Sequence, residues 1–93
     1  MEVLEIRNVQ LSKLPENIGS LKNLKNLVIF NTQLKQLPKT IGNLKNLTYL
    51  KLLRNPIKEL PNSIKNLKNI KEISLDKQLL NESINIWLER LGK

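Results

Sequence analysis

The side chains that most often perform catalysis are scarce in this sequence. The chain contains no His and no Cys, which removes the usual general base, the commonest metal ligand and the thiolate nucleophile. Glu72 and Asp76 stand four residues apart on a predicted strand among lysines. A Lys base remains open in principle, but no pattern places a pocket around one. We therefore expect no enzymatic activity, no metal and no cofactor.

Basic residues outnumber acidic ones by 16 to 8, for a formal net charge of +8. Such a balance attracts anionic partners without specifying a fold. Three lysines, Lys22, Lys45 and Lys68, recur at one spacing, as do Lys25 and Lys71. These columns could bind nucleic acid or an anionic membrane, or simply form a solvated face. No aromatic residues interleave them and no Gly-rich phosphate loop is present, so we favour the solvated face and expect no nucleic-acid partner.

The lysine spacing belongs to a repeat that runs through most of the chain. The phrase "LPENIGSLKNL" at Leu14–Leu24 returns as "LPKTIGNLKNL" at Leu37–Leu47 and as "LPNSIKNLKNI" at Leu60–Ile70, each time 23 residues later. Seven columns of Leu and Ile align at this period, among them Leu4, Leu27, Leu50 and Ile73. A fixed period of about 20 to 29 residues indicates a solenoid, whose units bury their apolar faces only against each other.

Each unit is expected to pair a short strand with a second, less regular half. In "LTYLKLLRNPI", apolar residues alternate around Leu50 and Leu52, which predicts a strand with its leucines pointing inward. The "LPxxIGxLxxL" half has apolar spacings of three and four, typical of a helical turn or an irregular extended segment, and its prolines oppose a long helix. A small helical bundle is the alternative, but a bundle gives no reason for a strict period.

The C-terminal residues depart from the repeat. Apolar residues at i, i+3, i+4 and i+7 predict one face of a helix: Ile84, Trp87, Leu88 and Leu91. Asn81 or Ser83 would cap its start and Gly92 its end, and we expect Trp87 to pack onto the last repeat rather than to serve as a binding hot spot. The sequence thus predicts one domain, residues 1–93, with units at about 1–23, 24–46, 47–69 and 70–80 and a capping helix at about 81–92.

The units resemble the leucine-rich repeat pattern L-x-x-L-x-L-x-x-N-x-L, which "LTYLKLLRNPI" matches most fully. Their second half is similar to the 23-residue class found in bacterial proteins, including small spirochaetal ones, and in Ras-group relatives of plants and animals. The resemblance covers about residues 3 to 80. It implies an α/β fold, a short curved solenoid with parallel strands on its concave side. It also implies a protein-binding role, although one scaffold of this kind serves many partners.

Two columns depart from that pattern. The family's asparagine, which bonds backbone groups between repeats, reads Val9, Thr32, Asn55 and Gln78 here. Thr32 and Gln78 would partly substitute for it, whereas Val9 would not. Lys65 also stands where the earlier units have Gly19 and Gly42. If those glycines need a positive φ, Lys65 must sit differently, although ordinary sequence drift is the simpler explanation.

Outward-pointing strand residues supply the candidate partner-binding site. Residues between the inward leucines face the concave side, and the middle rows there combine the only Phe and the only Tyr with basic residues. Aromatic and Arg side chains are the usual interface anchors, and we expect an exposed apolar patch with cations beside it. The predicted site is Val28, Phe30, Tyr49, Lys51, Leu53 and Arg54, with Phe30, Tyr49, Leu53 and Arg54 as the main anchors.

The N-terminal segment "MEVLEIRNVQ" suggests two further expectations. No cap precedes the first strand, so its edge would be open to self-association or to a partner, unless Met1, Glu2 and Glu5 shield it. The segment lacks a basic start followed by an apolar core, so we see no signal peptide and expect a cytoplasmic protein; a processed secreted form would look the same. No apolar run is long enough to span a membrane.

Overall fold

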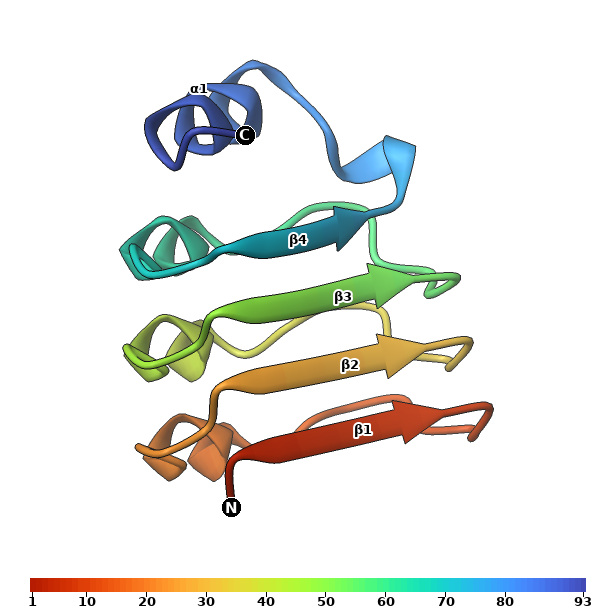
Figure 1. Ribbon diagram of the computed structural model, residues 1–93. Coiled ribbons are helices and arrows are strands. Elements are labelled where there is room, and N and C mark those ends of the chain that lie inside the picture. The colour runs from red at the N-terminus through yellow and green to blue at the C-terminus, as the bar shows by residue number, and fades with distance from the viewer.

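The computed structural model describes all 93 residues and contains one parallel sheet with a layer of short helices behind it (Figure 1). The sheet pairs four strands in chain order, β1 (Val3–Arg7), β2 (Asn26–Phe30), β3 (Tyr49–Leu53) and β4 (Glu72–Leu75). Each residue pairs with the one 23 positions later, as Leu4 does with Leu27 and Leu27 with Leu50. The 23-residue period therefore sets the register of the sheet, and the predicted strands are confirmed.

The second half of each unit contains a turn of 3-10 helix that begins directly after a proline. These turns are η1 (Glu16–Ser20), η2 (Lys39–Asn43) and η3 (Asn62–Asn66), preceded by Pro15, Pro38 and Pro61. Proline fixes φ near the value that a helix start requires and lacks the N–H that would go unpaired there. The sequence left a helical turn and an extended segment open for this half, and the structure contains the helical turn.

The repeated leucines form one core between the sheet and the 3-10 turns. Eighteen buried residues belong to it, and Leu27, Leu50 and Leu52 are fully buried. At the first unit the equivalent Leu4 and Ile6 are only partly buried, because no unit covers them on that side of β1. Each unit therefore depends on its neighbours for burial, as expected of a solenoid.

A helix closes the other end of the stack. After a short turn η4 (Lys77–Leu79), the helix α1 (Glu82–Arg90) lies over β4 (Figure 1). The Asn81 side chain accepts from the Ile84 N–H at 2.8 Å, and Gly92 has a φ of 82° in a Schellman motif in which the Lys93 N–H donates to the Leu88 carbonyl. Trp87 is 4% exposed and its indole N–H donates to the Leu67 carbonyl. The predicted capping helix is confirmed, with Asn81 rather than Ser83 as its N-cap.

Gly19 and Gly42 serve close packing between units, not a positive φ. A Cβ on Gly42 would lie 2.4 Å from the Ser63 carbonyl oxygen, and one on Gly19 would lie 2.6 Å from that of Thr40. Neither glycine has a positive φ, so the conformational reason considered for this column is wrong. Lys65 follows the same logic, because no further 3-10 turn stacks on η3 and a side chain has room there.

The asparagine column forms a partial ladder of hydrogen bonds through the bends after the strands. Asn55 Oδ1 accepts from the Thr32 N–H at 3.2 Å and from the Thr32 hydroxyl at 2.6 Å, while Asn55 Nδ2 donates to the Ile29 carbonyl at 2.9 Å. The Gln78 side chain reaches the Asn55 carbonyl at 3.4 Å. Val9 contributes nothing and is 46% exposed. The incomplete ladder expected from the sequence is confirmed.

Candidate protein-binding face

The face of the sheet that points away from the 3-10 turns, called here the concave face, carries three rows of side chains across the strands. The register places Asn26 beside Tyr49 at the strand starts, Val28 beside Lys51 in the middle, and Phe30 beside Leu53 at the strand ends. Directly paired residues on one face are close enough for their side chains to touch. The period of two along each strand thus puts all the predicted site residues up to Leu53 on one face.

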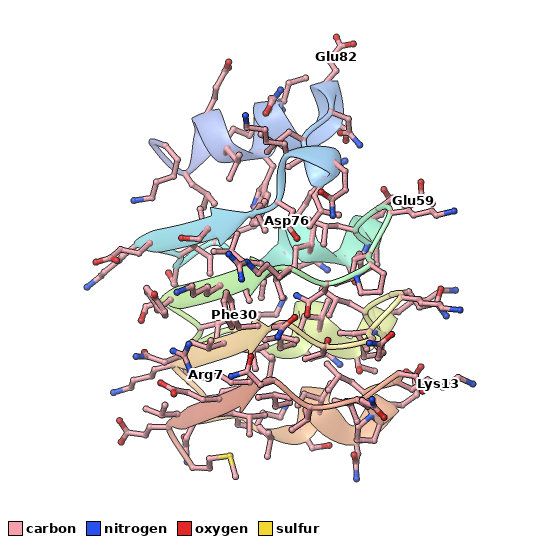
Figure 2. All side chains as sticks on the ribbon, turned by 90° about the vertical axis from the view of Figure 1, so that its right-hand side faces the viewer. Arg7, Lys13, Phe30, Glu59, Asp76 and Glu82 are labelled. Carbon is pink, nitrogen blue, oxygen red and sulfur yellow. The ribbon has the colours of Figure 1, made fainter.

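Three cations surround the single Phe at the ends of the strands. The Lys51 ammonium lies 5.4 Å from the Phe30 ring centroid, the Arg54 guanidinium 5.5 Å and the Arg7 guanidinium 5.9 Å. All three distances are within the range of cation–π attraction. Figure 2 shows Arg7 beside Phe30 on the strand side of the molecule, while Lys13 and Glu59 lie on the opposite side. We call Phe30, Arg7, Lys51 and Arg54 the Phe30 cluster.

Two of the three cations in the cluster have no acidic partner. Arg7 Nε lies 3.1 Å from Glu5 Oε1, and the other ion pair in the protein joins Lys25 to Glu2 at 3.8 Å. Lys51 and Arg54 form none. Like charges gathered on one ring repel each other, so this part of the face holds a positive charge that the protein itself does not balance.

Asp76 is the acidic side chain that comes near the cluster from β4, and it is engaged with backbone groups. Its two carboxylate oxygens accept from the Arg54 N–H at 3.1 Å and from the Asn55 N–H at 3.4 Å. It also accepts from the Gln78 side chain at 3.4 Å. This carboxylate fixes the bend after β3 and leaves the guanidinium group of Arg54 free to face solvent.

Arg54 occupies a backbone conformation that suits asparagine or glycine. Its φ is 58°, and the equivalent residues of the two preceding units, Asn8 and Asn31, have φ values of 56° and 57°. Asparagine adopts this left-handed conformation far more readily than arginine does. The two asparagines also bond to each other, with Asn31 Nδ2 donating to Asn8 Oδ1 at 2.8 Å. Arg54 interrupts this column and retains the strain, which is a feature typical of functional positions.

Val28 lies on the concave face but is not part of its exposed surface. Its exposed fraction is 2%, so the expectation that it contributes to an exposed apolar patch is wrong. Its partners in register are Glu5 and Lys51, whose longer side chains flank it, and the Lys51 ammonium extends to the Phe30 ring. Val28 therefore supports the face from beneath its neighbours.

Tyr49 lies apart from the other predicted anchors. Phe30 and Leu53 are paired in register and both are half-buried. Tyr49 begins β3 and Leu53 ends it, so about 13 Å of strand separates them at about 3.3 Å per residue. The structure thus brings Phe30, Lys51, Leu53 and Arg54 together and places Tyr49 at the far edge of the face.

Sequence reasoning placed Arg7 on the outward face but did not include it in the site. The signal was present, because Arg7 precedes Phe30 by the 23 residues of one repeat. That spacing makes the two residues partners in register on β1 and β2. The basic side of the cluster therefore spans three units.

The lysine columns lie away from the concave face, where the 3-10 turns lead into the strands. Lys22, Lys45 and Lys68 are exposed. Their backbone is held by a second ladder, in which Asn46 Nδ2 donates to the Lys22 carbonyl and Asn69 Nδ2 to the Lys45 carbonyl, each at 2.8 Å. The regular stripe of charge expected from the sequence is thus anchored by stacking.

Two open grooves and one sheet edge complete the surface features. The groove between η3 and α1 has a volume of about 540 Å³, and a second of about 960 Å³ lies over the loops that precede η2 and η3. At the N-terminal end the outer edge of β1 has no paired strand, and Val3 there is 51% exposed. No group of three or more acidic residues gathers as metal ligands would, and no helix is long and apolar enough to span a bilayer.

Comparisons with known proteins agree with this architecture. The model of the leucine-rich repeat region matches residues 1–93. A solved structure of a leucine-rich repeat protein from Leptospira interrogans superposes with a TM-score of 0.80 and 30% sequence identity, over 100% of this chain and 24% of that one. A search of curated proteins finds no match. Proteins with this fold are commonly protein-interaction modules and typically act as scaffolds without catalysis. The chain belongs to the leucine-rich repeat family.

Proposed function

We propose that this chain is a protein-interaction module that binds a partner through the concave face. Phe30, Leu53 and Arg54 form the centre of the contact surface, Lys51 flanks them, and Tyr49 makes a second contact at the far edge. Val28 holds these residues in place from below. The protein contributes binding and no chemistry of its own.

The observation that carries the proposal is the pairing of Phe30 and Leu53 on an outward face. Both side chains are half-buried rather than buried, and they are adjacent in register. Apolar groups on a face that could be polar indicate an interaction surface when they lie together and are bordered by polar residues. Aromatic residues with Arg beside them are also the residue types that dominate binding energy at interfaces.

The alternative function is electrostatic binding of an anionic surface through the exposed Lys22, Lys45 and Lys68. The stripe has the spacing for this, but it contains no aromatic side chain for base stacking. Binding through lysines would weaken steeply with salt, because each neutralised phosphate releases counterions. Binding centred on Phe30 and Leu53 would weaken much less.

The test is affinity capture from a native cell extract with three forms of the protein. These are the wild type, a concave-face variant (Tyr49→Ser/Leu53→Ser) and a matched lysine variant (Lys22→Ser/Lys45→Ser). Circular dichroism first establishes that both variants fold. We expect one or a few proteins to be lost with the concave-face variant and kept by the lysine variant. Retention of nucleic acid or lipid that disappears only with the lysine variant would refute the proposal.

A further inference from the structure

The Phe30 cluster has a composition that an apolar contact surface does not need. A ring that served only as an apolar anchor would offer its face to the partner. Here three cations lie within 6 Å of its centroid, two of them from β3 or the bend after it. The partner therefore meets positive charge at this point as well as aromatic surface.

We propose that the Phe30 cluster recognises a carboxylate side chain, Asp or Glu, in an acidic segment of the partner protein. This inference rests on the proposed function, and it specifies the chemistry of the partner at one position. Lys51 and Arg54 supply the charge, because both lack an acidic partner within the protein. Arginine and lysine bonds to a carboxylate are charge-assisted and stronger than neutral hydrogen bonds.

In this arrangement Phe30 positions the cations. Attraction between the ring and each cation holds three flexible side chains around one centre. The ordering of long side chains is part of the cost of binding, and side chains gathered before the partner arrives reduce that cost. Glu5 contributes in the same sense by holding Arg7 at 3.1 Å.

The strained backbone at Arg54 supports the inference independently of charge. Asn8 and Asn31 fill the same position of the preceding units without the strain that a positive φ imposes on arginine. An asparagine at position 54 would also be able to extend the bond between those two side chains. The chain instead carries a guanidinium group there, next to Phe30. A residue that lowers stability at an exposed position needs another reason to be present, and binding an anion supplies one.

Protein carboxylates fit the surroundings of the cluster better than nucleic acid does. Leu53 is paired with Phe30 and offers apolar surface beside the cations. The acidic residues Glu5, Glu72 and Asp76 also lie on or beside this face, so an extended polyanion would be repelled along most of it. A segment with one or two carboxylates among apolar residues meets both features.

The experiment uses NMR titration of the full chain, labelled with nitrogen-15 and carbon-13, with four probes. Two are synthetic peptides of the same apolar composition, one carrying Asp and Glu and the other carrying Asn and Gln at those positions. The others are inorganic phosphate and a single-stranded oligonucleotide. We expect the acidic peptide to shift the Phe30 ring protons and the Arg7 and Arg54 Nε–H signals, and the amide peptide to shift them at least about tenfold more weakly in affinity.

Two variants complete the test. Arg54→Asn places the residue found in the preceding units at the strained position, so this variant should fold at least as stably as the wild type while losing about tenfold in affinity for the acidic peptide. Phe30→Leu keeps an apolar side chain but removes the cation–π attraction, and it should weaken the same peptide. Lys45→Asn is the matched control away from the concave face and should leave the affinity unchanged.

The outcomes separate this inference from the proposed function. If the amide peptide binds as tightly as the acidic one, or if Arg54→Asn leaves the affinity unchanged, the carboxylate inference is wrong while concave-face binding stands. If the acidic peptide shifts only the lysine columns, or nothing at millimolar concentration, the inference also fails. Stronger shifts at the cluster by phosphate or by the oligonucleotide would identify a different anion and overturn it.

Discussion

Replacement of Asn55 by Ala should be among the most destabilising changes outside the leucine core. The Asn55 side chain is 5% exposed and takes part in three hydrogen bonds that join two units. Its removal leaves the N–H and the hydroxyl of Thr32, which is also 5% exposed, without their acceptor. The Ile29 carbonyl loses one donor as well. No water can replace the amide unless the bend between the units opens.

The magnitude follows from the burial of these groups. Each buried donor or acceptor left without a partner costs about 1 to 3 kcal/mol, so the two groups of Thr32 and the Ile29 carbonyl together predict a loss of about 3 kcal/mol or more. Small domains have about 5 to 15 kcal/mol of total stability. For a domain of this size about 4 to 8 °C of melting temperature corresponds to each kcal/mol, so the predicted decrease is about 12 to 24 °C.

The assay is thermal and urea unfolding followed by circular dichroism and by the fluorescence of Trp87. Trp87 lies in the capping helix and Asn55 two units' bends away from β1, so coincident transitions also show whether the solenoid unfolds as one unit. Asn85→Ala is the matched control, because Asn85 is exposed, lies within α1 and makes no side-chain hydrogen bond. It should be neutral or slightly stabilising. A loss below about 1 kcal/mol for Asn55→Ala would refute the reasoning, because it would mean that these groups are satisfied without the amide.

Three further predictions follow from other contacts. Gly42→Ala should destabilise the protein by about 1 to 3 kcal/mol in urea unfolding, because its Cβ would meet the Ser63 backbone at 2.4 Å, whereas Lys65→Ala at the equivalent position should change little. Arg54→Asn should raise the melting temperature by relieving the strain of a φ of 58°, and an unchanged or lower value would contradict that interpretation. The unpaired edge of β1 should allow self-association at high concentration, which Val3→Lys should reduce in light scattering; a wild-type mass that stays monomeric would argue against it.

Most of the fold could be read from the period. A repeat of 23 residues places each leucine beside its counterpart in the next unit, and the alternation around Leu50 and Leu52 identifies the strand within the unit. The helical spacing of Ile84, Trp87 and Leu88 likewise identifies the cap. These features depend on local pattern and on identical neighbours, so no knowledge of the tertiary structure is needed to find them.

The candidate site was only partly predictable, because lateral packing depends on side-chain length as well as on register. Val28 and Lys51 have the same outward orientation in the sequence pattern, yet Val28 is buried between longer neighbours. Tyr49 and Leu53 share a strand and a face but lie at opposite ends of it. The approach of Lys51 to Phe30 is diagonal across two strands, and the period alone does not specify such a contact.

By itself the sequence determined the repeat, the strands, the aliphatic core and the capping helix, because each of these follows from the spacing of apolar residues along the chain. The stacked structure decided what that spacing leaves open. It showed that Gly42 is needed for contact with the next unit and not for its φ, that Asp76 serves the bend after β3, and that three cations from separate segments meet at Phe30. These properties belong to pairs of residues on different units, and only the close approach of the units brings them into contact.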